Sequence, residues 1–152
     1  MINIYTDGSA VANPKYEHCG EGGFAVVFTI DGEIKKEISE GWFPTKTGRM
    51  ELRAILKALK ILSKDQKATI ISDSMYCINC FQKNWLRSWE REGWPVRIKN
   101  IDILKELLVE FRKFPMGSIK FKHIKGHTGD RFNERADELA SYKNFETFKK
   151  DL

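Results

Sequence analysis

Hydrophobic and polar positions divide the first third of the chain into short strands. Residues 1–6 form one apolar run, and residues 22–30 form another that is rich in the β-branched and aromatic side chains favoured in sheets. Asp31-Gly32 is typical of a two-residue hairpin turn, after which residues 33–42 return as a more polar strand. The pattern predicts an antiparallel meander of three strands.

Beyond Pro44 the apolar spacing changes to a helical period. Leu52, Ile55, Leu56, Leu59 and Leu62 share one helical face, and Thr47 is the expected N-cap of that helix. Further patterns predict a strand at 67–74, one or two helices within 75–94, a helix at 100–114, a strand at 118–124, and a helix at 130–143 capped by Asp130. This order predicts an α/β fold whose mixed five-stranded sheet combines the meander with two parallel strands and carries helices on both faces.

Composition narrows the class of protein. The 152 residues fit a single domain spanning 1–152, and an excess of 26 Lys and Arg over 21 Asp and Glu favours a polyanionic partner. Three cysteines make a disulfide framework improbable, and Cys77 and Cys80 are expected to pack in the core, with a metal or redox role as the alternative. No signal peptide or membrane-spanning run is present, which predicts a cytoplasmic protein without a membrane partner.

Four acidic residues stand at places where the fold could bring them together. Asp7 interrupts an apolar strand, Asp73 follows another strand, Glu51 lies near the start of the first long helix, and Asp137 lies on the last one. Each has an ordinary explanation as a turn, a cap or an exposed helix residue. Parallel neighbouring strands would, however, place Asp7 and Asp73 at the edge of the sheet where α/β proteins bind ligands.

Together these acids predict a cation site built from oxygen ligands. Mg²⁺ and Mn²⁺ prefer carboxylate and water, and the chain lacks the Cys and His spacing of a zinc site. Four carboxylates would neutralise two divalent ions. A pair of ions about 3.5 to 4 Å apart is the arrangement that serves phosphodiester hydrolysis.

Four segments in this order, "YTDGS", "GRMEL", "ISDSMY" and "KGHTGDRFNERADELA", resemble type 1 ribonuclease H from Tyr5 to Tyr142. The resemblance implies that Asp7, Glu51, Asp73 and Asp137 are the metal-binding acids. It also implies two Mg²⁺ ions, replaceable by Mn²⁺, and cleavage of the RNA strand of an RNA–DNA hybrid to give 3′-hydroxyl and 5′-phosphate ends. No separate hybrid-binding domain is expected, and a monomer is favoured.

His127 is the expected proton-transfer residue. The resemblance assigns it to a mobile histidine, and its place between Gly126 and Gly129 predicts a loop in which an imidazole could move. A histidine there can carry a proton near neutral pH. His18, in a polar loop, and His123, within a strand, are expected to have structural or solvated roles.

Residues 83–99 interleave basic residues with tryptophans and are the best candidate for contact with the DNA strand. The expected substrate-binding residues are Trp85, Arg87, Trp89, Arg97 and Lys99, joined by Asn13 and Thr47 through the resemblance. Core packing is an equal alternative for Trp85 and Trp89.

Some positions depart from the family pattern. Thr47 and Gly48 replace two asparagines, Met75 replaces a glutamine, the basic insertion after "GW" is reduced to "PVRIK", and the stretch Tyr16 to Glu21 is longer than the family's glycine turn. A thioether cannot donate a hydrogen bond to a ribose hydroxyl. Two alternatives therefore stay open, a metal-dependent DNA nuclease or strand-transfer enzyme of the wider ribonuclease H-like group and a non-catalytic hybrid-binding module. The biological pathway and the strictness of RNA selection stay open as well.

Overall fold

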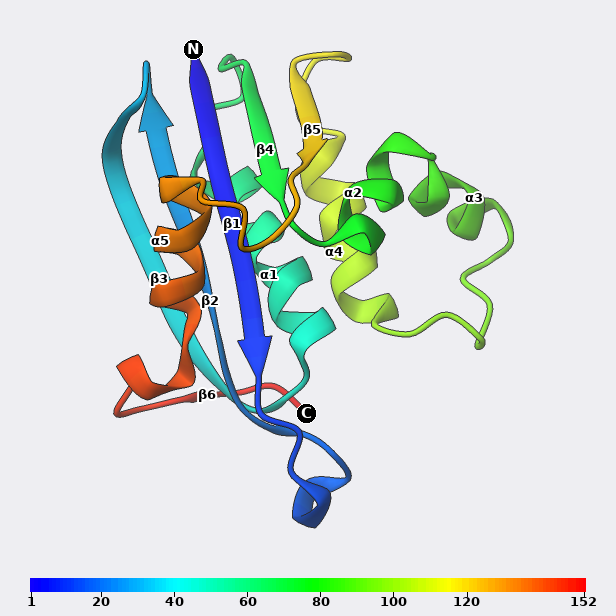
Figure 1. Cartoon of the computed structure of the whole chain (residues 1–152). Helices are drawn as coiled ribbons and strands as arrows, with labels where there is room; N and C mark the ends of the chain where they lie inside the picture. The colour runs from blue at the N-terminus through cyan, green and yellow to red at the C-terminus, as the bar shows by residue number, and fades with distance from the viewer.

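The computed structural model, which describes residues 1–152, places six strands in one mixed sheet in the order β5-β4-β1-β2-β3-β6 (Figure 1). The meander consists of β1 (Ile2–Ala10), β2 (Gly20–Ile30) and β3 (Glu33–Thr45), which pair antiparallel. The strands β4 (Ala68–Ser72) and β5 (Ile119–His123) follow in parallel beside β1. The prediction of a mixed α/β sheet with a three-strand meander is confirmed.

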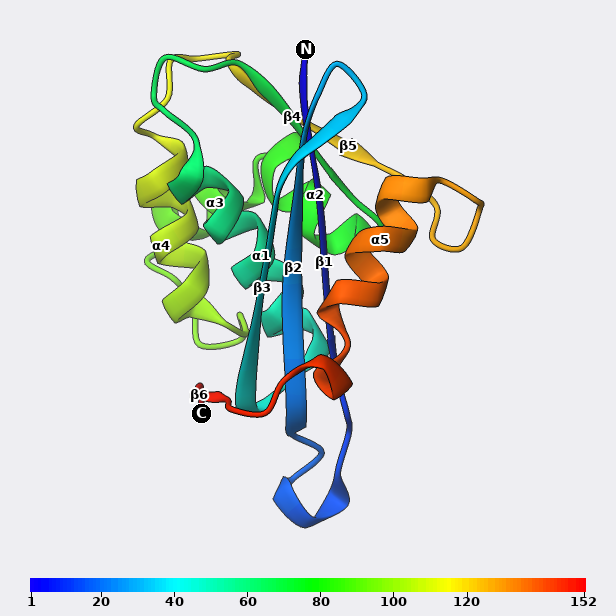
Figure 2. The same cartoon turned by 90° about the vertical axis from the view of Figure 1, so that its left-hand side faces the viewer.

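Helices cover both faces of this sheet, as predicted. One face carries α1 (Thr47–Ile61) and α4 (Ile101–Phe111), with the short helices α2 (Met75–Gln82) and α3 (Trp85–Arg91) beside them. The other face carries α5 (Arg131–Ala140), and Figure 2 shows the two sets of helices on opposite sides of the strands. Short 3₁₀ turns span Pro14–Tyr16 and Tyr142–Asn144.

Alternation along the central strands divides the core between the two faces. Ile4 and Ile70 belong to the larger cluster under α1 and α4, whereas Tyr5 and Ile71 belong to a smaller cluster under α5. Since successive side chains of a strand point to opposite faces, β1 and β4 are buried on both sides. Packing on both faces therefore holds β1 and β4, and the side chains near their ends, in fixed positions.

Several sequence expectations are confirmed and others need correction. Asp31 and Gly32 both have positive φ, as the predicted hairpin turn requires, and Asp130 caps α5 by accepting hydrogen bonds from the N–H groups of Phe132 and Asn133. Cys77 and Cys80 are free, buried members of the larger core. The strand expected at 1–6 extends to Ala10, so Asp7 lies inside it, opposite Ala25.

The expectation that Thr47 caps α1 is wrong. Lys46 is the N-cap and provides no side-chain hydrogen bond. The Thr47 hydroxyl oxygen instead accepts a hydrogen bond from the N–H of Ala10 at 3.1 Å, which ties the end of β1 to the start of the helix. A hydroxyl can serve a neighbouring strand as well as its own helix, and spacing alone does not decide between the two.

The sheet has six strands, one more than predicted. The sixth, β6 (Lys149–Lys150), is a two-residue strand parallel to β3. It is held by Asp151, whose fully buried carboxylate accepts hydrogen bonds from Arg49, Arg53 and Thr45. These bonds outweigh the effect of burial and hold the pKa of Asp151 at about 2. A strand of two residues is too short to show a hydrophobic alternation. A buried ion-pair network stabilises it in place of apolar packing.

Gly8 allows β1 and α1 to approach each other closely. A Cβ atom at this position would lie 2.4 Å from both the backbone nitrogen of Glu51 and the carbonyl carbon of Met50. Neither atom can move without shifting the helix. The absence of a side chain at residue 8 therefore sets how near Asp7 and Glu51 can lie.

We expect Gly8→Ala to lower the free energy of unfolding by about 2 kcal/mol or more, because overpacking against backbone cannot relax by a rotamer change. Gly48→Ala is the matched control, since the nearest atom to its Cβ, Asn100 Nδ2, lies 4.0 Å away in the exposed first turn of α1. That control should be neutral or stabilising by up to about 1 kcal/mol. Urea denaturation measures both variants, and equal stabilities for the two would contradict the close-contact account.

Candidate active site

Asp7 and Asp73 lie side by side because their strands are parallel neighbours in register. Thr6 of β1 pairs with Ser72, the last residue of β4, so Asp7 within β1 and Asp73 just past the end of β4 follow this pair directly. Asp7 is only 5% exposed, and its carboxylate accepts a hydrogen bond from the N–H of Gly8 at 2.9 Å. Asp73 is half-buried and begins the turn into α2.

Glu51 and Asp137 approach these two acids from opposite faces of the sheet. Glu51 is half-buried on α1, and the thiol of Cys77 lies 3.9 Å from its Oε2 atom. Asp137 lies on α5, one residue after Ala136, which is buried against β1, and its own side chain is exposed. Phe132 packs against Tyr5 with tilted rings whose centroids lie 5.3 Å apart, and this contact helps to hold α5 in place. The structure thus brings the four predicted acids together from four separate elements.

Burial and mutual repulsion dominate the electrostatics of these acids. Burial, the charge of Asp73 and a hydrogen bond with Asp137 raise the pKa of Asp7 from its ordinary value of 3.8 to about 8. Burial also raises the pKa of Glu51, and burial together with Asp137 raises that of Asp73. None of the four acids forms a salt bridge with a Lys, Arg or His side chain.

The chemistry of this donor set suits a divalent ion. Four carboxylates without a cationic partner are the hard oxygen ligands that Mg²⁺ and Mn²⁺ prefer. No three His, Cys, Asp or Glu side chains are placed closely enough to enclose an ion directly. The acids are therefore neighbours with uncompensated charge, and they do not form a closed coordination shell.

His127 lies on the loop between β5 and α5. Its backbone adopts the left-handed conformation at φ 58°, and its side chain is exposed. The loop touches the acids, because a Cβ on Gly126 would lie 3.1 Å from Asp73 Oδ2, and His127 partly offsets the rise in the pKa of Asp73. His123, by contrast, lies on β5 with its Nε2 atom 3.2 Å from the backbone oxygen of Asp73, and His18 is exposed in the loop after β1.

The predicted substrate-binding residues fall into two groups. Asn13 and Thr47 lie near the end of β1, where Asn13 caps the first 3₁₀ turn by accepting from the N–H of Lys15. Trp89, Arg97 and Lys99 line one pocket of about 280 Å³ together with Tyr76, Ile98 and Asn100. Trp85 and Arg87 lie outside that pocket on α3.

Trp85 and Trp89 combine both interpretations of the sequence. They pack against the larger core, yet both are half-buried and contact the ring of Tyr76, on which Trp89 stacks and to which Trp85 is tilted. Sequence reasoning missed Tyr76 and Asn100. Arg49 donates to the Asn100 side chain at 3.3 Å and to Asp102. The signal available for Tyr76 was its position three residues after Asp73, in the first turn of the helix that follows it.

This sheet, with unpaired carboxylates from both faces gathered beside two parallel strands, has the architecture of a metal-dependent phosphodiester hydrolase. Comparisons with known proteins identify the family. The family model described as RNase H matches residues 1–144. The chain therefore belongs to the ribonuclease H family, whose members are metal-dependent endoribonucleases.

Relatives of similar length support the assignment. The chain is 42% identical over 144 residues to a ribonuclease H of Syntrophomonas wolfei, an alignment that covers 91% of this chain and 92% of the relative. It is 38% identical over 143 residues to that of Caldicellulosiruptor saccharolyticus, with coverages of 91% and 92%.

A solved structure shows the same fold. It is described as LC9-RNase H1, a type 1 RNase H with the type 2 active-site motif, and aligns with a TM-score of 0.74. Sequence identity is 23%, and the alignment covers 91% of this chain and 69% of that one. The sequence-based prediction of a ribonuclease H is confirmed over its two alternatives.

The raised pKa of Asp7 predicts a pH-dependent instability of the metal-free protein. Folded Asp7 keeps its proton up to about pH 8, whereas the unfolded chain loses it near pH 3.8. The stability that this group contributes is therefore complete below about pH 4 and is lost as the pH rises through about 8. Asp7→Asn removes that loss, so we expect the variant to melt at a higher temperature than wild type in chelator at pH 8.

Thermal melts in chelator at pH 5 and pH 8, repeated with millimolar Mg²⁺, check this expectation. The difference in melting temperature between Asp7→Asn and wild type should shrink at pH 5, where Asp7 is protonated in the folded wild type. It should also shrink with Mg²⁺, because ions that bind the folded state stabilise the wild type by mass action. A variant that melts below wild type at pH 8 in chelator would mean that the hydrogen bond from Gly8 outweighs the repulsion.

Proposed function

We propose that Asp7, Glu51, Asp73 and Asp137 bind two Mg²⁺ ions, replaceable by Mn²⁺, in an endonuclease that hydrolyses the RNA strand of RNA–DNA hybrids. The observation that carries the proposal is the group of four acids from β1, α1, α5 and the end of β4, which includes a nearly buried aspartate and has no basic side chain to balance it. Unpaired charges of this kind lower the stability of a fold, so a group that served stability alone would carry opposite charges beside the acids or apolar residues in their place.

In the reaction a water oxygen forms a bond to phosphorus while the bond from phosphorus to O3′ breaks, leaving a 3′-hydroxyl and a 5′-phosphate. Bound divalent ions would stabilise charge on the attacking and leaving oxygens. The carboxylates would hold the ions from two faces of a rigid sheet, and this would fix where the scissile phosphate must lie. His127, exposed on the loop beside Asp73, moves a proton from the water or to the leaving oxygen.

Two surfaces flank the acids and are proposed to hold the hybrid. Asn13 and Thr47 would contact it near the end of β1. Trp85, Arg87, Trp89, Arg97 and Lys99 would contact the DNA strand on the other side, with Tyr76 and Asn100 added to that group by the pocket they share. Aromatic rings offer stacking surfaces and the basic residues bind phosphates.

Met75 is exposed in the first turn of α2, two residues after Asp73. It can contribute only apolar contact to a ribose, so selection of RNA depends on the other polar groups.

No helix in the chain is long and apolar enough to cross a membrane. We propose that the enzyme acts in the cytoplasm as a single-domain monomer.

Loss of one carboxylate tests the metal site. Asp73→Asn should reduce turnover on hybrid with Mg²⁺ by more than about 100-fold, because loss of a direct ligand should cost more than the roughly 10- to 100-fold typical of groups that only orient a ligand. The circular dichroism spectrum should stay that of the wild type, because Asp73 is a half-buried residue outside the hydrophobic clusters. Near-normal cleavage would exclude Asp73 as a ligand.

Two histidine variants distinguish loss of proton transfer at His127 from the general effect of removing an imidazole. His127→Ala should reduce turnover by about 10²-fold without greatly changing Mg²⁺ affinity, as expected for a general acid or base. The control, His18→Ala in another exposed loop, should cleave like the wild type. Loss of metal binding in His127→Ala would instead make the histidine a ligand.

The salt dependence of binding tests the basic segment. Arg87 is exposed and has no ion-pair partner, whereas Arg97 pairs with Glu92 at 2.6 Å. Arg87→Gln should lower the slope of log affinity against log salt by up to about one unit, the contribution of one phosphate contact. Lys105→Gln, an equal charge change on α4, should leave the slope unaltered, and an unchanged slope in both would place the hybrid elsewhere.

A further inference from the structure

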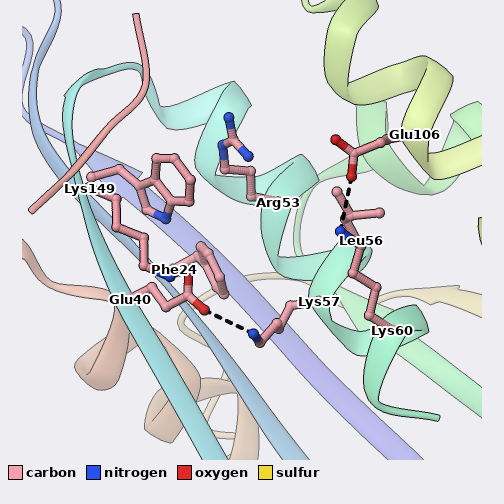
Figure 3. Close-up of a pocket in the computed structure, with 9 residues that line it drawn as sticks. Phe24, Glu40, Arg53, Leu56, Lys57, Lys60, Glu106 and Lys149 are labelled. Atoms are coloured by element: carbon pink, nitrogen blue, oxygen red, sulfur yellow. Dashed lines mark hydrogen bonds and ion pairs between the residues drawn. The ribbon is translucent and has the colours of Figure 1, made fainter.

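A pocket of about 230 Å³ lies between α1 and the outer edge of the sheet (Figure 3). It is separate from the acids described above. Glu51 and Arg53 are two residues apart on α1 and so leave the helix on different sides. The Glu51 carboxylate lies beside Cys77 of α2, whereas the Arg53 guanidinium lies 3.9 Å from the ring centroid of Trp42 on β3.

Two of the residues that line this pocket carry a buried hydrogen-bond donor without an acceptor. The donors are the indole Nε1 of Trp42 on β3 and the Nε of Arg53 on α1. Only the NH2 group of Arg53 is paired, with Asp151 at 2.6 Å. Buried N–H groups in folded proteins are almost always paired, so two unpaired ones on neighbouring side chains indicate a place where an acceptor is missing.

The charges around the pocket indicate which acceptor it takes. Its lining contains four cationic residues and two acidic ones: Arg53, Lys57, Lys60, Lys149, Glu40 and Glu106. Glu106 pairs with Lys60 at 3.0 Å, and Glu40 alone serves both Lys57 and Lys149, each at 3.0 Å. Burial opposes ionisation of Glu40, yet the two lysines hold its pKa below the ordinary value. The pocket is therefore positive even with its own acids in place.

We propose that this pocket binds a small phosphate-class oxyanion, either free phosphate or pyrophosphate or the phosphoryl group of a mononucleotide. The ionised oxygens of such a group are acceptors, and their tetrahedral arrangement lets them accept from donors on separate walls at once. Here the donors open to the pocket are the ammonium groups of Lys57 and Lys149, and a bound oxygen would reach the buried Trp42 Nε1 and Arg53 Nε once those side chains shift. A volume of about 230 Å³ falls below the roughly 300 to 1,000 Å³ of drug-sized ligand sites, which fits a small anion.

The indole N–H resonance of Trp42 reports on this site directly. Two-dimensional ¹H–¹⁵N NMR of the full chain, with Trp42→Phe to assign the resonance among four tryptophans, follows titrations with phosphate, pyrophosphate and adenosine monophosphate. Sodium chloride at matched ionic strength is the reference. We expect a saturable shift of this resonance with each phosphate compound and none with chloride.

Variants then test the proposed donors. Lys149→Gln and Lys57→Gln should each weaken pyrophosphate binding by at least about tenfold, the loss expected for one charge-assisted hydrogen bond. The second variant leaves β6 untouched and covers the case in which the first disturbs that strand. Lys36→Gln, an equal charge change at an exposed position of β3, should bind like the wild type.

Three results would overturn the proposal. They are no saturable shift with any phosphate compound, equal binding by all three lysine variants, or binding of adenosine monophosphate without binding of phosphate or pyrophosphate. The last would mean that the base is recognised and not the phosphoryl group. Similar affinities for phosphate and the mononucleotide would show that the phosphoryl group suffices.

Discussion

The crowding of four acidic side chains, one of them buried inside a strand, is the constraint on which the rest of the structure depends. Asp7 is placed inside a central strand with 5% of its surface exposed, beside Asp73 and Asp137 and without a basic partner. Burial first, and then the charge of Asp73 and the hydrogen bond with Asp137, raise the pKa of Asp7 to about 8, so its ionisation costs stability in the absence of a ligand. In the proposed metal site a bound cation would offset this cost, so the arrangement that weakens the metal-free fold would also give the site its affinity for divalent ions.

The remaining elements hold these charges in place against their repulsion. Gly8 lets β1 press against α1, and the parallel register of β1 and β4 sets Asp7 beside Asp73. Arg49 lies on α1 two residues before Glu51. It forms ion pairs with Asp102 of α4 and with Asp151 of the C-terminal segment, which fix this part of the helix. Asp7, Glu51 and Asp137 therefore stand on strands or helices that pack on the two core clusters, and Asp73 directly follows β4, so only His127 lies in a longer loop.

Much of this arrangement could be predicted from the sequence because it rests on local patterns. The meander, its Asp31-Gly32 turn and the cap at Asp130 follow from hydrophobic period and turn chemistry. The strand β6 could not be predicted, because a buried carboxylate and two arginines stabilise it in place of an apolar repeat. The pairing of Thr47 with Ala10 and the grouping of Tyr76 with Trp89 depend on contacts between distant segments, which no local pattern encodes.

The most direct measurement of the central claim is the number of protons released when Mg²⁺ binds. Calorimetric titrations at one pH in buffers of different ionisation enthalpy give that number. Because Asp7 has a pKa of about 8 without metal, binding at pH 7 should release close to one proton, and binding above pH 9 should release almost none. Binding at pH 7 without proton release would contradict the account, since it would show that Asp7 is already ionised in the metal-free protein and that neither burial nor the neighbouring acids raise its pKa.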